Sequence, residues 1–188
     1  MKKQKEKIVG ISLDGVLRNI TGTFERIYTR MYPERTVKRP VNMFNILDSF
    51  PFESKDEMNE FVMSEALIIF GRAEEMRRDA MADLNKILPQ LKEKGYRVIL
   101  ISKESGKTKG GTHVFLGDKA CEINEIRFVE DNQDFWRDID ILVTANPEII
   151  ALKPKGKKAL VYNNHSLNKE LRHARRIYNI KDILTKLS

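Results

Sequence analysis

Several residue types and sequence features are scarce in this chain of 188 residues, and each scarcity excludes a class of protein. The single cysteine, Cys121, excludes an internal disulfide and a zinc site of several thiolates, so a reducing compartment is the default. The longest apolar run, residues 66–70, is too short to span a bilayer. The basic start leads into a short strand-like run rather than into the apolar segment of a signal peptide. We therefore expect a cytoplasmic protein with no membrane partner.

The composition is that of one globular domain rather than of a disordered chain. Apolar residues make up 41% of the sequence and charged residues 32%, whereas aromatic residues make up only 8%. A chain of this length can bury a core and carry a small insertion, but two full domains are not expected.

Positive charge is concentrated near the C-terminal end of the sequence. Residues 151–188 contain ten lysines and arginines against two acidic residues. Because the whole chain has a net charge of +7, the remaining residues together have a net charge of about −1. A basic surface at residues 153–176 could bind nucleic acid or another acidic surface, or it could be an ordinary solvated face. A helix expected over 167–178 would point some of these side chains outward. The candidate partner-binding residues are Lys155, Lys157, Lys158, Lys169, Arg172 and Arg176.

Five apolar runs of strand length follow one another along the chain, and segments with helical spacing separate them. The runs are continuous rather than alternating, which is typical of strands covered on both faces in a parallel sheet. The clearest helix is expected over 80–94, just before Gly95. These features predict an α/β three-layer sandwich with a five-stranded parallel sheet. The runs span residues 8–12, 97–102, 126–129, 139–144 and 158–162.

More than eighty residues separate the first run from the second, far more than a crossover helix needs. We expect a helix over 21–32, then a proline-marked segment and a second helix over 56–69. Residues 33–76 are therefore interpreted as a small helical cap inserted into a core of residues 1–32 and 77–188. The cap and the sheet would face each other across a cleft.

Four stretches in this order resemble motifs of the haloacid dehalogenase-like (HAD-like) superfamily, and within it the 5'(3')-deoxyribonucleotidase type found in bacteria and phages. The resemblance covers almost the whole chain and implies a Rossmann-like core with a small cap. In sequence order, the stretches are IVGISLDGVLRNITGTF, RVILISKES, FLGDKACEI and DIDILVTANPEII.

The resemblance also implies a role for each motif position, and several positions are altered here. The family's nucleophile, an aspartate that also binds magnesium, corresponds to Ser12, whereas the general acid is kept as Asp14. The paired acids that complete the metal site correspond to Thr144 and Ala145. The remaining positions of this degenerate site are the hydroxyl of the second motif and the lysine expected on a helix, Ser102 and Lys119.

These changes predict the loss of catalysis. A serine hydroxyl is a poor nucleophile without a neighbouring base, and magnesium prefers several carboxylate oxygens. We therefore expect no catalytic residue, no metal and no cofactor. Ser12, Ser102 and Lys119 could still bind an anion such as phosphate without a metal. In the alternative, they only satisfy neighbouring polar groups.

Two substitutes for the lost acids are less favoured. Asp14 could be the nucleophile in a shifted register, but the turn after it would then be misplaced. Asp138 and Asp140 precede their strand, whereas sites in open α/β sheets lie at the carboxyl ends of strands. The glycine- and lysine-rich stretch at residues 105–111 is interpreted as a flexible loop, because it lacks the spacing of a phosphate-binding loop.

The sequence is thus interpreted as an inactive HAD-like protein that acts as a binding or structural module. A phage virion or assembly component with protein partners is a setting that the resemblance suggests. One alternative is a weak nucleotide phosphatase that uses Asp14 and magnesium. A second alternative is a metal-independent sensor of nucleotide or phosphate.

Overall fold

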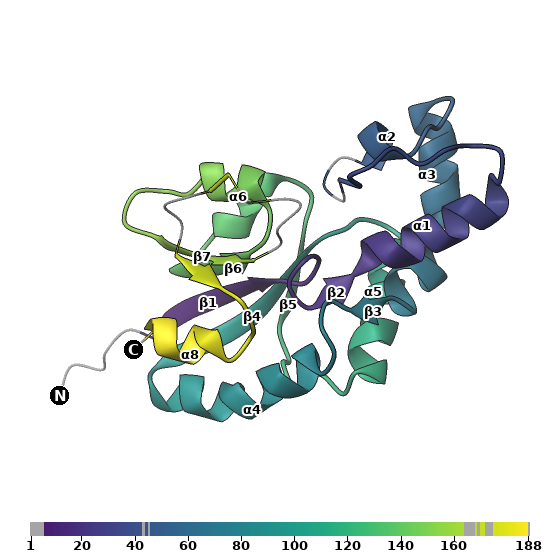
Figure 1. The fold of residues 1–188 in the computed structure, drawn as a ribbon. Helices are drawn as coiled ribbons and strands as arrows, with labels where there is room; N and C mark the ends of the chain where they lie inside the picture. Colours follow the sequence, from purple (N-terminus) through teal and green to yellow (C-terminus); the bar gives the residue numbers. More distant parts are fainter. Residues whose placement is uncertain are drawn as a thin grey trace.

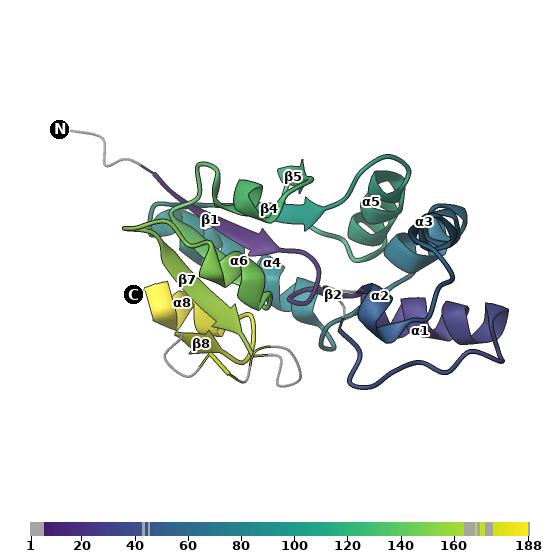
Figure 2. The ribbon, with the colours of Figure 1, turned by 90° about the horizontal axis from the view of Figure 1, so that it is seen from above.

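The computed structural model describes residues 6–42, 44, 46–163, 168, 170–171 and 175–187. Its centre is a six-stranded parallel sheet in the order β5-β4-β1-β6-β7-β8 (Figures 1 and 2). β1 lies in the middle, between β4 and β6. The strands are β1 (Lys7–Ser12), β4 (Tyr96–Lys103), β5 (Ile126–Val129), β6 (Ile141–Thr144), β7 (Lys158–Tyr162) and β8 (Arg176–Ile177).

Helices cover both faces of the sheet, because alternate residues of each central strand point to opposite faces. In β4, Leu100 joins the larger core cluster, whereas Ile99 and Ile101 join a smaller one. Figure 1 shows the helices of one face below the sheet and those of the other above it. The larger cluster is covered by α4 (Ala80–Glu93) and α8 (Asp182–Leu187), the smaller by η2 (Asn132–Trp136) and α6 (Pro147–Ala151).

The cap lies beyond the carboxyl ends of the strands (Figure 1). The chain enters and leaves it through an antiparallel two-stranded ribbon, β2 (Arg18–Asn19) with β3 (Glu74–Glu75). Between the two strands come α1 (Ile20–Met31), α2 (Ile46–Ser49), α3 (Lys55–Ser64) and a π-helical segment, η1 (Leu67–Gly71).

Helix α1 packs with the inserted helices rather than with the sheet. Its aromatic side chains join those of the insertion in one cluster, with ring centroids 4.7 to 6.3 Å apart. The boundary at residue 33 stays a prediction, but the packing unit of the cap includes the preceding helix. The cluster consists of Phe24, Tyr28, Tyr32, Phe50, Phe52 and Phe61.

The three-layer architecture matches the sequence prediction, but some elements differ from it. The sheet has a sixth strand, because Arg176–Ile177 pairs with β7 where a helix over 167–178 is predicted. Residues 167, 169 and 172–174 of that helix lie outside the described part of the chain. The helix predicted over 56–69 is divided into α3 and η1. No helix in the described ranges is long and apolar enough to cross a membrane.

The stretch predicted as a loop at residues 105–111 is largely helical. Helix α5 (Thr108–Asp118) begins within it, and Gly111 of this helix meets η1 closely. A Cβ atom on Gly111 would lie 2.9 Å from the carbonyl oxygen of Ala66. Glycine here therefore allows two helical segments to approach each other, rather than making the chain flexible.

Candidate functional site

The candidate site lies where three neighbouring strands end. Ser12 is the last residue of β1 and Thr144 the last of β6, and Ser102 is the last but one of β4. Because the strands are parallel, their carboxyl ends meet at one edge of the sheet. All three hydroxyl residues line a single cleft there, together with Asp14. The structure thus brings four of the predicted site residues together.

A tight turn after β1 places Asp14 beside Arg18. The backbone N–H groups of Leu17 and Arg18 both donate to the carbonyl oxygen of Leu13, at 3.0 and 2.9 Å. Gly15 has φ of +79°, a conformation that residues with a side chain rarely adopt. The turn brings Arg18 Nε within 2.6 Å of Asp14 Oδ1.

The side chain of Arg18 is fully buried and binds both core and cap. Its Nη2 donates to Glu104 Oε1 at 2.6 Å, and its Nη1 donates to Thr112 Oγ1 at 2.5 Å. Nη1 also donates to the carbonyl oxygen of Phe70, at the end of the cap, at 3.1 Å. The rings of Phe70 and Phe115 lie 5.2 and 5.5 Å from the guanidinium carbon. Arg18 therefore connects the β2–β3 ribbon, the sheet edge, α5 and η1.

Glu104 is the second buried charge of the site. Its Oε1 accepts from Arg18, from Ser102 Oγ at 2.6 Å and from Thr112 Oγ1 at 2.5 Å. Ser102 Oγ also lies 3.3 Å from Asp14 Oδ2, so both oxygens of Asp14 have a polar neighbour. We call Asp14, Arg18, Ser102, Glu104 and Thr112 the buried ion cluster.

Electrostatics keep the Arg18 guanidinium charged. Burial acts to lower the pKa of the Arg18 guanidinium, but the charges and hydrogen bonds of Asp14 and Glu104 outweigh it and raise that pKa. With two carboxylates and one guanidinium, the cluster has a formal charge of −1. The positive charge of Arg18 is thus neutralised within the chain and is not free to bind an anion.

Two buried polar atoms at the cleft have no hydrogen-bond partner among the described residues. They are Ser12 Oγ and Glu104 Oε2, in side chains that are 3% and 5% exposed. A buried polar group without a partner costs about 1–3 kcal/mol. These two atoms therefore mark the floor of the cleft as a place where a polar ligand would be stabilised.

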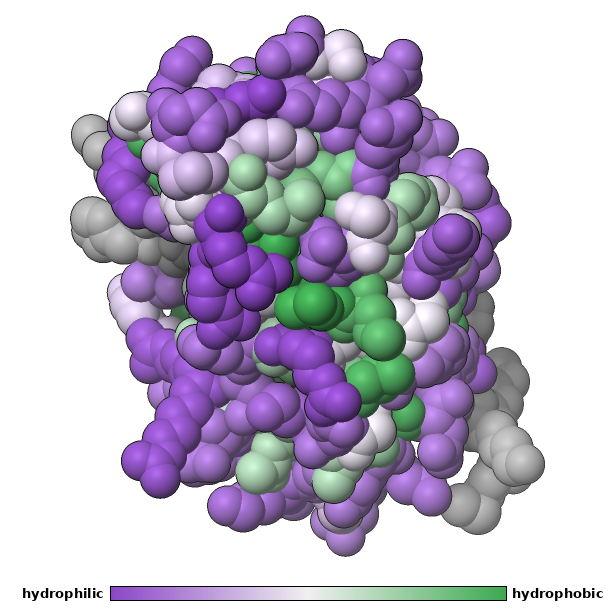
Figure 3. Space-filling view, turned by 90° about the vertical axis from the view of Figure 1, so that its right-hand side faces the viewer, coloured by the Kyte–Doolittle hydropathy of each residue, from purple (hydrophilic) through white to green (hydrophobic). Residues whose placement is uncertain are grey.

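The cleft has a volume of about 570 Å³ and two unlike walls. The core contributes hydroxyls and carboxylates, whereas the cap contributes apolar side chains from α2, α3 and the segment before α2. Met63 lines the cleft and is 38% exposed, so the apolar wall continues to the surface. On the cap side of the molecule, a band of hydrophobic residues crosses a mostly hydrophilic face (Figure 3).

Two predicted site residues lie elsewhere. Lys119 follows the last residue of α5, outside the set of described residues that line the cleft, because the helix begins rather than ends at the site. Cys121 lies in the loop beyond this helix. Ala145 is buried and is not among the described residues that line the cleft. Thr144 Oγ1 accepts from the backbone N–H of Asn146 at 3.2 Å, so it satisfies its own strand end.

The residues of the cleft do not fit magnesium. The oxygens of Asp14 are already engaged by Arg18 and Ser102. At the end of β6, Thr144 and Ala145 stand where the paired acids of the resemblance would be, and neither has a carboxylate. No group of three or more histidine, cysteine, aspartate or glutamate residues in the described ranges is arranged to hold a metal ion. Asp140 lies at the amino end of β6, where it accepts from the backbone N–H of Ile8 at 2.8 Å.

The predicted basic surface is only partly described. Lys155 and Lys158 are exposed, whereas Lys157 Nζ donates to the carbonyl oxygen of Trp136 at 2.6 Å. Arg176 does not point freely outward: its Nη1 donates to Asn163 Oδ1 at 3.1 Å and to Asn168 Oδ1 at 2.7 Å. It therefore holds the chain around β8 together. Lys169 and Arg172 lie outside the described residues.

The sequence interpretation missed the two central residues of the cluster, Arg18 and Glu104. Each had a local signal: Arg18 directly follows the apolar run Val16–Leu17, and Glu104 directly follows a buried strand. A charged residue in such a position is buried only with a partner. The partner is 86 residues away in the chain, so the pair could not be identified before the fold was known.

No protein-family model matches the sequence, and no curated protein matches it. Solved structures match nearly the whole chain. CbbY from Rhodobacter sphaeroides, in complex with phosphate, aligns with 95% of this chain and 96% of its own, with a TM-score of 0.64 and 15% identity. A HAD-superfamily hydrolase of subfamily IA from Geobacter sulfurreducens aligns with 96% and 99%, with a TM-score of 0.58 and 12% identity.

A third structure agrees with these two. A haloacid dehalogenase-like family hydrolase from Xanthomonas campestris aligns with 100% of this chain and 92% of its own, with a TM-score of 0.55 and 13% identity. These likenesses show that the chain has the HAD-like fold, and they confirm the fold class predicted from the sequence.

Proposed function

We propose that this protein is a catalytically inert HAD-like protein, of the deoxyribonucleotidase-like type with degenerate motifs, that acts as a binding module. The observation that carries the proposal is the buried ion cluster. Arg18 and Ser102 engage the oxygens of Asp14, the one motif carboxylate that is kept. The acid that a phosphatase of this fold would use is thereby committed to a structural ion pair.

The nucleophile position supports the same proposal. Ser12 Oγ has no hydrogen-bond partner in the described part of the chain, so no base is placed to accept its proton. Without an anionic nucleophile and without a metal to neutralise developing charge, several kcal/mol of transition-state stabilisation are lost, and each loss of about 1.4 kcal/mol lowers the rate tenfold.

A phosphatase assay tests the proposal directly. We expect no hydrolysis of p-nitrophenyl phosphate or of a deoxynucleoside monophosphate above the blank, with or without magnesium. The variant Asp14→Asn should behave in the same way, and circular dichroism would establish that both proteins are folded. Magnesium-dependent turnover that Asp14→Asn abolishes would contradict the proposal and would support the alternative of a weak nucleotide phosphatase.

The setting of such a module follows from the resemblance alone. A role as a phage virion or assembly component would place the chain among protein partners. Mass spectrometry of purified particles, with the chain tagged and untagged, would detect it there. Its absence from the particles would contradict this part of the proposal.

A further inference from the structure

We infer that the cleft binds an organic ammonium ion, with the charged head against the core carboxylates and the carbon chain against the cap. The inference rests on the proposed binding function and names its ligand class. It differs from the anion site expected from the sequence, because the lysine of that site lies elsewhere and a different cation, Arg18, is already paired.

The charge of the cleft favours a cation. Four carboxylate residues line it, whereas Lys103 is the one basic residue among the described lining residues. Counting the buried Arg18 as well, acids exceed bases by two in a protein whose net charge is +7. An anionic hollow in a basic protein concentrates cations and repels phosphate. The four acids are Asp14, Glu104, Glu130 and Glu148.

The floor of the cleft offers acceptors. Ser12 Oγ and Glu104 Oε2 are buried and without partners among the described residues. An ammonium group has three donors and no acceptor, so it could satisfy both atoms and still donate to a third. A phosphate oxygen could use the hydroxyl of Ser12 as a donor, but it would be placed against the Glu104 carboxylate. The floor of the cleft therefore favours a cationic ammonium group over an anionic phosphate.

The rim supplies further negative charge. Glu130 and Glu148 are both exposed, and Glu148 Oε2 accepts from Asn132 Nδ2 at 3.0 Å. Lys103, the one basic residue among the rim residues that the structure describes, donates through its Nζ to Asn132 Oδ1 at 3.2 Å. Asn132 thus holds Lys103 and orients Glu148. The carboxylates of Glu130 and Glu148 could then bind the second ammonium group of a diamine.

The cap wall fits the carbon chain of such a ligand. It is formed mainly by Phe44, Ile46, Met58, Val62 and Met63. Methionine side chains adapt to flexible aliphatic ligands, and the cleft volume of about 570 Å³ lies within the range of small-molecule sites. A short aliphatic diamine therefore matches the acidic floor, the apolar wall and the acidic rim together.

The experiment compares probes that differ mainly in charge. Isothermal titration calorimetry on the full chain would use hexamethylenediamine, the neutral hexanediol of equal carbon number, and inorganic phosphate. We expect the diamine to bind and to raise the unfolding temperature, and its affinity to fall as salt is added. Hexanediol and phosphate should bind at least tenfold more weakly. Equal binding of diamine and diol, or preferred binding of phosphate, would overturn the inference.

Exposed rim residues provide a variant that is expected to fold. Glu130→Gln combined with Glu148→Gln should weaken diamine binding about fivefold, the effect of two partly screened charges. The matched control is Glu93→Gln with Glu122→Gln, which removes two exposed acids outside the cleft and should leave the affinity unchanged. Equal weakening by both pairs would contradict the site. If the unaltered protein shows neither diamine binding nor phosphatase activity, only this inference is refuted, whereas turnover refutes the proposed function.

Discussion

At the scale of single residues, Arg18 links the stability of the fold to the chemistry of the site. Its guanidinium is fully buried between two carboxylates and also binds the end of the cap. Because both acids are largely withdrawn from water, removal of the cation would leave uncompensated negative charge in the interior. Arg18 therefore contributes to stability chiefly by neutralising its neighbours.

The variant Arg18→Met tests this role. It keeps much of the apolar stem but removes the charge, and we expect a loss of about 3–5 kcal/mol in the free energy of unfolding. Urea denaturation followed by circular dichroism would measure the loss. Adding Asp14→Asn and Glu104→Gln to Arg18→Met removes the stranded charges and should restore part of it. A triple variant no more stable than the single one would contradict the account.

Two buried tyrosines form a second matched test at this scale. Tyr28 and Tyr162 are at most 1% exposed, but only the Tyr28 hydroxyl has a partner in the described residues, donating to the carbonyl oxygen of Pro51 at 2.7 Å. Tyr28→Phe should cost about 1 kcal/mol, whereas Tyr162→Phe should leave stability unchanged or raise it by up to about 1 kcal/mol. Thermal denaturation of both variants would check the difference, and an equal loss in both would refute it.

At the scale of elements, the contact between α5 and η1 depends on the absence of a side chain at Gly111. A Cβ atom there would lie 2.9 Å from both Ala66 O and Phe70 Cβ, whereas one on Gly110 would meet nothing within 4 Å. Gly110→Ala should therefore stabilise the helix by up to about 1 kcal/mol. Gly111→Ala should instead destabilise the protein by about 1–3 kcal/mol through overpacking. Equal unfolding temperatures for the two variants would contradict the packing argument.

The elements also show which parts of the fold the sequence can predict. Strands β5 and β7 match their predicted ranges, because a continuous apolar run both favours a strand and specifies burial on two faces. Strand β8 has only two residues and exists because β7 offers an edge, so no local pattern indicates it. The division between α3 and η1 follows from tertiary packing against α5, which local spacing does not record.

The location of the candidate site also follows in part from the sequence and in part only from the fold. Ser12, Asp14, Ser102 and Thr144 line one cleft, because parallel strands deliver their carboxyl ends to one edge. Lys119 lies at the far end of α5, because the direction of this helix decides which of its ends faces the cleft. The cation that the structure places beside Asp14 comes from the turn after β1 instead.

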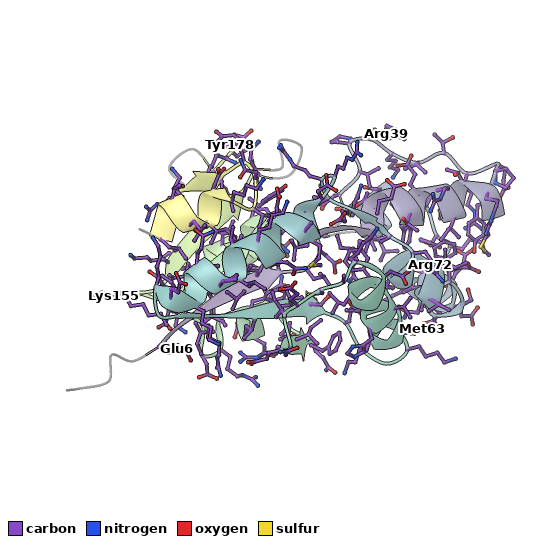
Figure 4. All side chains as sticks on the ribbon, turned by 90° about the horizontal axis from the view of Figure 1, so that it is seen from below. Glu6, Arg39, Met63, Arg72, Lys155 and Tyr178 are labelled. Carbon is purple, nitrogen blue, oxygen red and sulfur yellow. The ribbon has the colours of Figure 1, made fainter. Side chains whose placement is uncertain are left out.

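At the scale of the whole molecule, charge is separated along its length. The acidic cleft lies beside the cap, whereas Lys155, on the predicted basic surface, lies at the opposite end from Met63 and Arg72 (Figure 4). A molecule with this distribution can hold a cationic ligand at one end and meet an acidic surface with the other. The two proposed binding functions can therefore be tested with separate variants.

A nucleic-acid partner for the basic end makes a quantitative prediction. Binding to duplex DNA, followed by fluorescence anisotropy, should weaken with salt, and Lys155→Gln with Lys158→Gln should reduce the slope of log K against log salt by up to about two. Arg176 is unsuitable for this test because it binds Asn163 and Asn168 within the chain. The control pair, Lys55→Gln with Lys107→Gln, removes the same charge from exposed positions outside residues 153–176. An equal effect of both pairs would mean that the total charge of the protein, rather than this surface, attracts DNA. The absence of binding at low salt would identify the surface as an ordinary solvated face.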